Sequence, residues 1–134
     1  MNVSHKIDGL IETLNNLKTD LPPKLETLSE KIISSFTKGG KLLIMGNGGS
    51  ASDAQHLAAE FVGRFKADRR PLPAIALTCN TSIITSVSND FSFDEIFSRQ
   101  IEALANDKDV VIAISTSGNS KNVIEAVKTA KSKG

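Results

Sequence analysis

Residues 1–40 carry apolar side chains at helical spacing in two successive segments. The first segment predicts an amphipathic helix over residues 4–18, whose apolar face consists of Ile7, Leu10, Ile11, Leu14 and Leu17. After Pro22-Pro23, the same spacing continues in a stripe made of Leu25, Leu28, Ile32, Ile33 and Phe36. Because proline breaks a helix interior but is tolerated in the first turn, we expect the two prolines to separate two helices. We expect Gly39-Gly40 to end the second helix, and we expect the apolar faces to pack partly on a sheet and partly on another subunit.

From residue 41 onwards, short apolar runs alternate with longer helical patterns. We expect strands at residues 41–45, 73–78 and 109–115, and helices at 50–66, about 92–105 and 120–133. The runs are rich in Ile, Leu, Val and Ala and show little alternation, which is typical of a sheet that is covered on both faces. The order predicts an α/β fold with a doubly wound parallel sheet, an αβα sandwich, preceded by two N-terminal helices. We therefore divide the single domain into packing and oligomerisation helices at 1–40 and an α/β unit at 41–134.

The three expected strands make a narrow sheet for this architecture. The last helical pattern ends in lysines and Gly134, after which another strand normally follows. We therefore expect the chain to be a piece of a larger domain, or the product of a damaged gene.

Two polar loops follow two of the expected strands. Ligands of parallel sheets bind beyond the carboxyl ends of the strands. Gly46-Asn-Gly-Gly-Ser50 offers glycines that let a phosphate approach and a serine that can cap the next helix, whose free N–H groups favour an anion. Ser115-Thr-Ser-Gly-Asn-Ser120 repeats this arrangement with hydroxyls, and Ser120 is placed to cap a helix. One such loop is common as a simple helix cap, but two in one sheet predict a phosphorylated ligand.

His56 and Glu60 stand at positions i and i+4 of the helix that follows the first loop. Their side chains therefore share one face, where an imidazole and a carboxylate suit proton transfer, metal binding or both. Taken alone, His56 is also explained as a hydrogen-bonded core histidine, and Glu60 as a solvated helix residue. The basic residues Arg64, Lys66, Arg69 and Arg70 are expected on a solvated surface, with Arg64 as the exception.

Several functional classes are disfavoured. Gly46, Gly48 and Ala51 fit the dinucleotide pattern G-x-G-x-x-A, but no carboxylate follows the next strand to hold a ribose, and the Walker pattern is absent. The net charge of +1 and the lack of Trp and Tyr argue against nucleic-acid binding. We find no membrane span or signal peptide pattern. Cys79 is the single cysteine, which excludes internal disulfides and fits a cytoplasmic location.

The two loops, the His56/Glu60 pair and Asn89-Asp90 together resemble the phosphoheptose isomerases, which are enzymes of the sugar isomerase (SIS) domain family. Residues 70–76 and 97–100 also resemble that family, and the motifs stand in the same order along nearly the whole chain. The resemblance implies a SIS-type fold and the isomerisation of sedoheptulose 7-phosphate to D-glycero-D-manno-heptose 7-phosphate through an enediol. It also implies a homotetramer with active sites between subunits, a zinc ion, and a place at the start of nucleotide-activated heptose synthesis.

The resemblance assigns roles to particular residues. Ser50, Ser115, Ser117 and Ser120 would hold the sugar phosphate, and the rest of the substrate site would consist of Asn47, Gly48, Gly49, Thr116, Asn89 and Asp90. Glu60 would be the catalytic base and, together with His56, a zinc ligand. Arg64 would reach the substrate across a subunit interface. Asp90 is also explained as the start of the following helix.

One departure from the family concerns the metal. Family members supply further ligands and the acid partner of Glu60 from a C-terminal glutamine and histidine, and the only other histidine here is His5. We therefore expect weak metal binding by this chain.

Two alternatives to an enzyme remain. One is a SIS-fold adaptor that binds the replication initiator protein, and the other is a sugar-phosphate sensor. Adaptors of this kind lack the carboxylate at the position of Glu60 and alter the second loop, whereas Glu60 and Ser117 are both present here.

Overall fold

The computed structural model describes residues 2–134 as five α-helices, one 3-10 helix and three strands. In chain order these are α1 (Val3–Thr37), β1 (Leu42–Gly46), α2 (Gly49–Val62), β2 (Ala74–Ala76), α3 (Thr81–Asp90), the 3-10 helix η1 (Phe93–Glu95), α4 (Ser98–Leu104), β3 (Val110–Ile114) and α5 (Lys121–Ser132). They form two compact units, one up to Ser34 and one from Ser35 to Gly134. Within residues 2–134, no helix has the length and apolarity that crossing a membrane requires.

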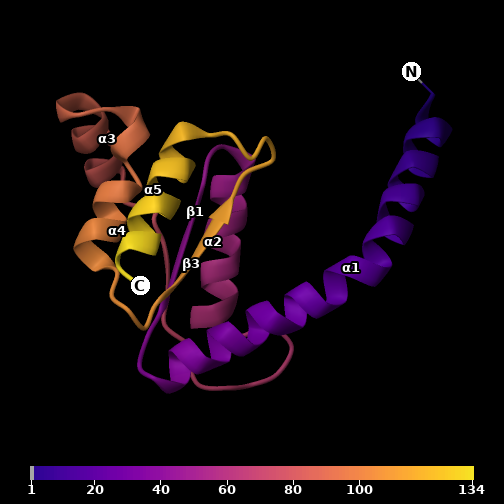
Figure 1. Ribbon diagram of the computed structural model, residues 1–134, viewed down its shortest axis with the longest axis horizontal. Coiled ribbons are helices and arrows are strands. Elements are labelled where there is room, and N and C mark those ends of the chain that lie inside the picture. The colour runs from indigo at the N-terminus through magenta and orange to yellow at the C-terminus, as the bar shows by residue number, and fades with distance from the viewer. Residues whose placement is uncertain (1) are drawn as a thin grey trace. The chain divides into compact units, whose positions relative to one another are not determined.

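From Val3 onwards the first unit is a single helix, and the expected break at Pro22-Pro23 is wrong. Both prolines lie inside α1, which Figure 1 shows bending part-way along its length. The fixed φ of proline is itself helical, so the ring costs mainly the hydrogen bonds to the preceding turn. Here the neighbouring residues are exposed, so water can satisfy the freed carbonyls and the helix bends instead of ending.

The second unit is a parallel three-stranded sheet in the order β2-β1-β3, which confirms the α/β prediction. All five residues of β1 are buried because strands flank it on both sides and helices cover both faces. In Figure 1, α2 lies on one side of the sheet, and α4 and α5 lie on the other.

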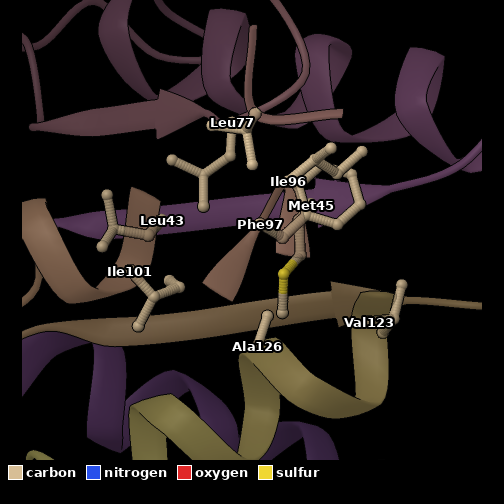
Figure 2. Close-up of a cluster of buried hydrophobic side chains, with 9 residues drawn as sticks. Leu43, Met45, Leu77, Ile96, Phe97, Ile101, Val123 and Ala126 are labelled. Atoms are coloured by element: carbon tan, nitrogen blue, oxygen red, sulfur yellow. The ribbon is translucent and has the colours of Figure 1, made fainter. Parts of the chain in front are cut away.

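The main core lies between the sheet and the α4/α5 side. Leu43 and Met45 point from β1 into it and meet Phe97, Ile101 and Ala126, as Figure 2 shows. Alternation along the strand turns Leu42 and Ile44 to the opposite face, where α2 packs on β1. A central strand that is apolar on both faces thus explains the near-continuous hydrophobic run in the sequence.

Two helices differ from expectation. The expected helix at about 92–105 is η1 followed by the shorter α4, and α3 precedes them unpredicted. The Asn80 side chain caps α3 by accepting a hydrogen bond from the Ile83 amide at 3.1 Å. Serine, threonine and β-branched residues are poor helix formers, so the intrinsic preference of this segment concealed a helix that packing on the core stabilises.

A buried carboxylate ties the strands together at the end of the sheet opposite the two polar loops. The Asp109 side chain is 1% exposed and accepts hydrogen bonds from Lys41 Nζ at 2.6 Å, from the Lys41 amide at 2.9 Å and from the Asn106 amide at 2.9 Å. Burial raises the pKa of Asp109, but the hydrogen bond from Lys41, the two amides and the lysine charge lower it more, so the pKa lies below its ordinary value. This group holds the starts of β1 and β3 side by side.

Replacing Asp109 with asparagine should destabilise the protein in a pH-dependent way. The charged acceptor is lost, so the free energy of unfolding at neutral pH should fall by about 1–3 kcal/mol. Because the folded-state pKa is lowered, the wild-type stabilisation is present above the ordinary carboxyl pKa and disappears as pH falls through the folded value. The difference between wild type and Asp109→Asn should therefore shrink in acid. Urea unfolding across pH checks this, with the exposed Asp107→Asn as control; equal losses in both variants would contradict it.

Candidate functional site: two hydroxyl-rich loops and an imidazole–carboxylate pair

The first loop leaves β1 and turns at once into α2. A Cβ on Gly46 would come within 2.6 Å of the Ser50 carbonyl oxygen, and Gly48 has a φ of +54°, so the tight turn requires glycine at both positions. Gly48, not Ser50, stands at the N-cap position of α2. The expectation that Ser50 caps the helix is therefore wrong, because the positive φ of Gly48 starts the helix earlier. Ser50 is instead a buried residue of its first turn.

The second loop gathers three serine hydroxyls. Ser115 Oγ lies 3.3 Å from Ser120 Oγ and 3.5 Å from Ser117 Oγ. The amide of Gly118 donates to Ser115 Oγ at 3.1 Å, and the amide of Asn119 donates to Ser117 Oγ at 3.2 Å. Ser120 occupies the N-cap position of α5 without a capping hydrogen bond from its side chain. Its hydroxyl therefore faces the other serines, and the group can donate several hydrogen bonds to one anion.

The register of the sheet places the two loops together. Gly46 at the end of β1 pairs with Ile114 at the end of β3, so both loops emerge from the same edge, as Figure 1 shows. Side chains also connect them: Asn47 and Asn122 exchange two hydrogen bonds of 2.9 Å. Sequence reasoning missed Asn122. Its signal was an asparagine four residues before Ala126, on the apolar face of the last helix.

His56 and Glu60 share one face of α2, as expected. His56 Nε2 lies 3.5 Å from Glu60 Oε1, and the side chains are 75% and 31% exposed. The alternative of a core histidine is therefore wrong. The pair lines a hollow of about 380 Å³ whose other walls are Leu57, Phe61, Phe65 and Arg69. An accessible imidazole beside a carboxylate in an apolar hollow can exchange protons with a bound molecule.

A stretch of α2 separates the pair from the first loop. His56 is six residues beyond Ser50 and Glu60 is ten, which along a helix corresponds to about 9 and 15 Å. One chain therefore presents an anion-binding end and a proton-transfer end that are separated along α2.

Three predicted substrate residues, Arg64, Asn89 and Asp90, lie outside the two loops and do not line the hollow beside His56 and Glu60. The helix α2 ends at Val62, so Arg64 lies beyond it and is exposed, which corrects its expected place on a further helical turn. Asn89 and Asp90 are exposed at the C-terminal end of α3, where Asn89 Nδ2 donates to Asp90 Oδ1 at 2.8 Å. Asp90 thus ends a helix, and the explanation that it starts the next one is wrong. Thr116, in contrast, lies on the second loop itself, where it is exposed.

Arg69 was also misjudged. Instead of lying on a solvated surface, its guanidinium donates to the carbonyls of Glu60 at 2.6 Å and Phe61 at 2.9 Å. These are carbonyls of the last turn of α2, which has no further helical partners for them. Arg69 therefore closes the end of the helix that carries Glu60.

Comparisons with known proteins agree with this geometry. The SIS domain model matches residues 7–134. Phosphoheptose isomerases of Pelobacter propionicus and Citrifermentans bemidjiense are 56% and 54% identical, over 86% and 100% of this chain. The chain belongs to the phosphoheptose isomerase group of the SIS domain family. The phosphoheptose isomerase structure from Neisseria gonorrhoeae superposes with a TM-score of 0.89 at 42% identity, over 98% of this chain and 68% of that one. The prediction of a SIS fold is thereby confirmed.

The match to these phosphoheptose isomerases is partial on their side. The chain spans 61% of the length of the P. propionicus protein and 70% of the C. bemidjiense protein. It spans 72% of a structurally similar phosphoheptose isomerase from Francisella tularensis, which has a TM-score of 0.88 and 36% identity.

The residues described here do not by themselves fit a catalytic zinc site. Such sites usually have three protein ligands. Within residues 2–134, no three His, Cys, Asp or Glu side chains gather at one point, and His56 and Glu60 remain a pair.

The backbone of the first loop provides a test of this geometry. Gly48→Ala should lower the free energy of unfolding by about 1–2 kcal/mol, because an L side chain is strained at its positive φ. Gly49→Ala is the matched control, since Gly49 has no such φ and a Cβ there would meet no atom within 4 Å. Thermal or urea unfolding measures both variants. Equal destabilisation of the two would contradict the assigned loop conformation.

Proposed function

We propose that this chain carries the substrate-binding and base-bearing part of a phosphoheptose isomerase that converts sedoheptulose 7-phosphate to D-glycero-D-manno-heptose 7-phosphate. The observation that carries the proposal is that all 134 residues of this chain align with a protein of that name, at 54% identity. The adaptor and the sensor are not favoured by the relatives. The geometry adds a chemical reason, since one edge of the sheet suits a phosphate and one face of α2 suits proton transfer.

The phosphate would be held by the serine hydroxyls. Ser115, Ser117 and Ser120 already face one another, and Ser50 lies in the first turn of α2 across the same edge. The partial positive charge at the N-terminal ends of α2 and α5 would favour the negative charge. Asn47, Gly48, Gly49 and Thr116 would contact the sugar next to the phosphate. Binding energy from this end would hold the reacting carbons in place.

Glu60 would be the base of the reaction. An aldose–ketose isomerisation removes a proton from the carbon beside the carbonyl, forms an enediol and returns the proton to the neighbouring carbon. The Glu60 carboxylate is about one-third exposed in an apolar hollow, and Arg69 closes the backbone end of its helix. His56, 3.5 Å away, would orient the carboxylate. In a seven-carbon substrate the carbonyl and the phosphate lie at opposite ends, in agreement with two sites separated along α2.

The assembly extends the proposal to more than one subunit. Arg64, Asn89 and Asp90 are exposed and lie outside the two loops, so they would act on the substrate of a neighbouring subunit. The exposed apolar residues of α1, such as Ile7, Leu10 and Leu14 at 53–58% exposure, suit burial against other copies. We therefore propose a homotetramer with active sites between subunits. It would act in the cytoplasm, at the start of nucleotide-activated heptose synthesis for surface polysaccharides.

Zinc remains part of the proposal only as a family property. His56 and Glu60 would supply two ligands, and further ligands would have to join them.

The activity is tested directly by incubating the chain with sedoheptulose 7-phosphate, with and without added zinc, and measuring the aldose product. We expect calorimetry to detect binding of sedoheptulose 7-phosphate. We expect turnover in a protein that also contains an acid partner for Glu60. If a correctly folded protein neither binds nor converts this sugar phosphate, the proposed function is wrong.

Glu60→Gln separates the base from the phosphate site. Turnover should fall at least about 100-fold, because a general base of this kind contributes that much to the rate. The affinity for inorganic phosphate should stay within about twofold, since the second loop, residues 115–120 (the serine loop), is a separate group of residues. Glu102→Gln, an exposed position on α4, is the control. Parallel loss of turnover and phosphate affinity in Glu60→Gln would refute the assignment of Glu60 as the base.

A further inference from the structure

Two asparagine side chains join the first loop to the last helix. Asn47 Nδ2 donates to Asn122 Oδ1 and Asn122 Nδ2 donates to Asn47 Oδ1, each at 2.9 Å, although 75 positions separate the two residues. Asn47 directly follows β1, and Asn122 is the second residue of α5. Within the described part of the chain, no other side-chain hydrogen bond joins residues 46–52 to residues 113–124. The pair is therefore the direct side-chain connection between the two anion loops.

The surroundings of Asn122 determine how its amide is turned. Its Oδ1 also accepts a hydrogen bond from the Val123 amide at 2.9 Å, which requires oxygen and not nitrogen at that place. With this orientation given, only one orientation of the Asn47 amide yields two hydrogen bonds. Reversal would place donor against donor and acceptor against acceptor. Asn122 is 2% exposed, so water cannot readily replace the missing partners.

We propose that Asn122 is a positioning residue that holds the Asn47 side chain at the correct distance from the serine loop for a phosphorylated sugar. The proposal rests on the proposed function, in which Asn47 contacts the sugar and the serines hold the phosphate. Asn122 acts through Asn47, because the oxygen and the nitrogen of its side-chain amide are both engaged with Asn47 and Val123.

This role has a selective consequence. Inorganic phosphate needs the serine loop and Ser50, which is held in the first turn of α2, whereas sedoheptulose 7-phosphate also needs the Asn47 side chain at a set separation from the serine loop. Loss of the amide pair should therefore weaken binding of the sugar phosphate more than binding of inorganic phosphate. A general loss of folding would weaken both.

The first experiment measures the Kd of both ligands by calorimetry for wild type and Asn122→Ala. We expect the affinity for sedoheptulose 7-phosphate to fall about tenfold and that for inorganic phosphate to change less than about twofold. Asn119→Ala, at an exposed asparagine just before α5, is the matched control and should resemble wild type in both. Equal losses for the two ligands, or no loss for either, would overturn the positioning role.

A double-mutant cycle tests whether Asn122 acts through Asn47. In the Asn47→Ala background, Asn122→Ala should cause less than about a twofold further loss of sedoheptulose 7-phosphate affinity. If the second substitution costs the same factor in both backgrounds, Asn122 has a purely structural effect and the proposal is wrong.

Asn122→Asp serves if Asn122→Ala does not fold. Aspartate keeps the acceptor for the Val123 amide and for Asn47 Nδ2 but cannot donate to Asn47 Oδ1. The charge of the aspartate would affect the binding of both anions, so the measured quantity is the Kd of inorganic phosphate divided by the Kd of sedoheptulose 7-phosphate. This ratio should move toward one. An unchanged ratio would overturn the proposal. Failure of the proposed function looks different, since the wild type itself would then show no preference for sedoheptulose 7-phosphate over inorganic phosphate.

Discussion

The parallel pairing of β1 with strands on both of its sides is the constraint on which the rest of the structure depends. Every residue of β1 is buried, and helices cover both faces of the sheet. Parallel strands end at the same edge, so the residues that follow β1 and β3 must lie side by side however far apart they are in the chain. The first loop, the serine loop and the Asn47–Asn122 pair are all consequences of that pairing.

The two ends of the sheet have different tasks. At one end, the Asp109 carboxylate is buried among a lysine and two backbone amides, and both of its oxygens accept hydrogen bonds. At the other end, serine hydroxyls face one another, and two helices begin with the partial positive charge of their N-terminal ends. A group whose partners are complete stabilises the fold, whereas hydroxyls gathered around one another remain able to receive a ligand. The two opposite ends of the strands thus provide stability and ligand binding in one small sheet.

The helix α2 sets the distance between the two kinds of chemistry. It begins in the first loop and carries His56 and Glu60 two to three turns away, on a face that borders an apolar hollow. A helix is stiff, so this distance is maintained without help from the loops. Arg69 strengthens the arrangement, because its guanidinium satisfies the carbonyls at the end of the helix. A substrate whose phosphate and carbonyl lie at opposite ends fits a site divided in this way.

Local pattern determined much of this protein. The three strands, the glycine turn after β1 and the shared face of His56 and Glu60 all follow from residues close together in sequence, because strand burial, positive φ and helical spacing are local properties. Other features were decided by tertiary structure alone. The helix α3 is stabilised by packing that outweighs its weak intrinsic preference. The contacts of Asn122 and Arg69 depend on partners from other segments, and no spacing along the chain reveals which carbonyl or amide a folded side chain will meet. The position of the serine loop beside the first loop likewise depends on the pairing of β1 with β3, two strands that are far apart in the sequence.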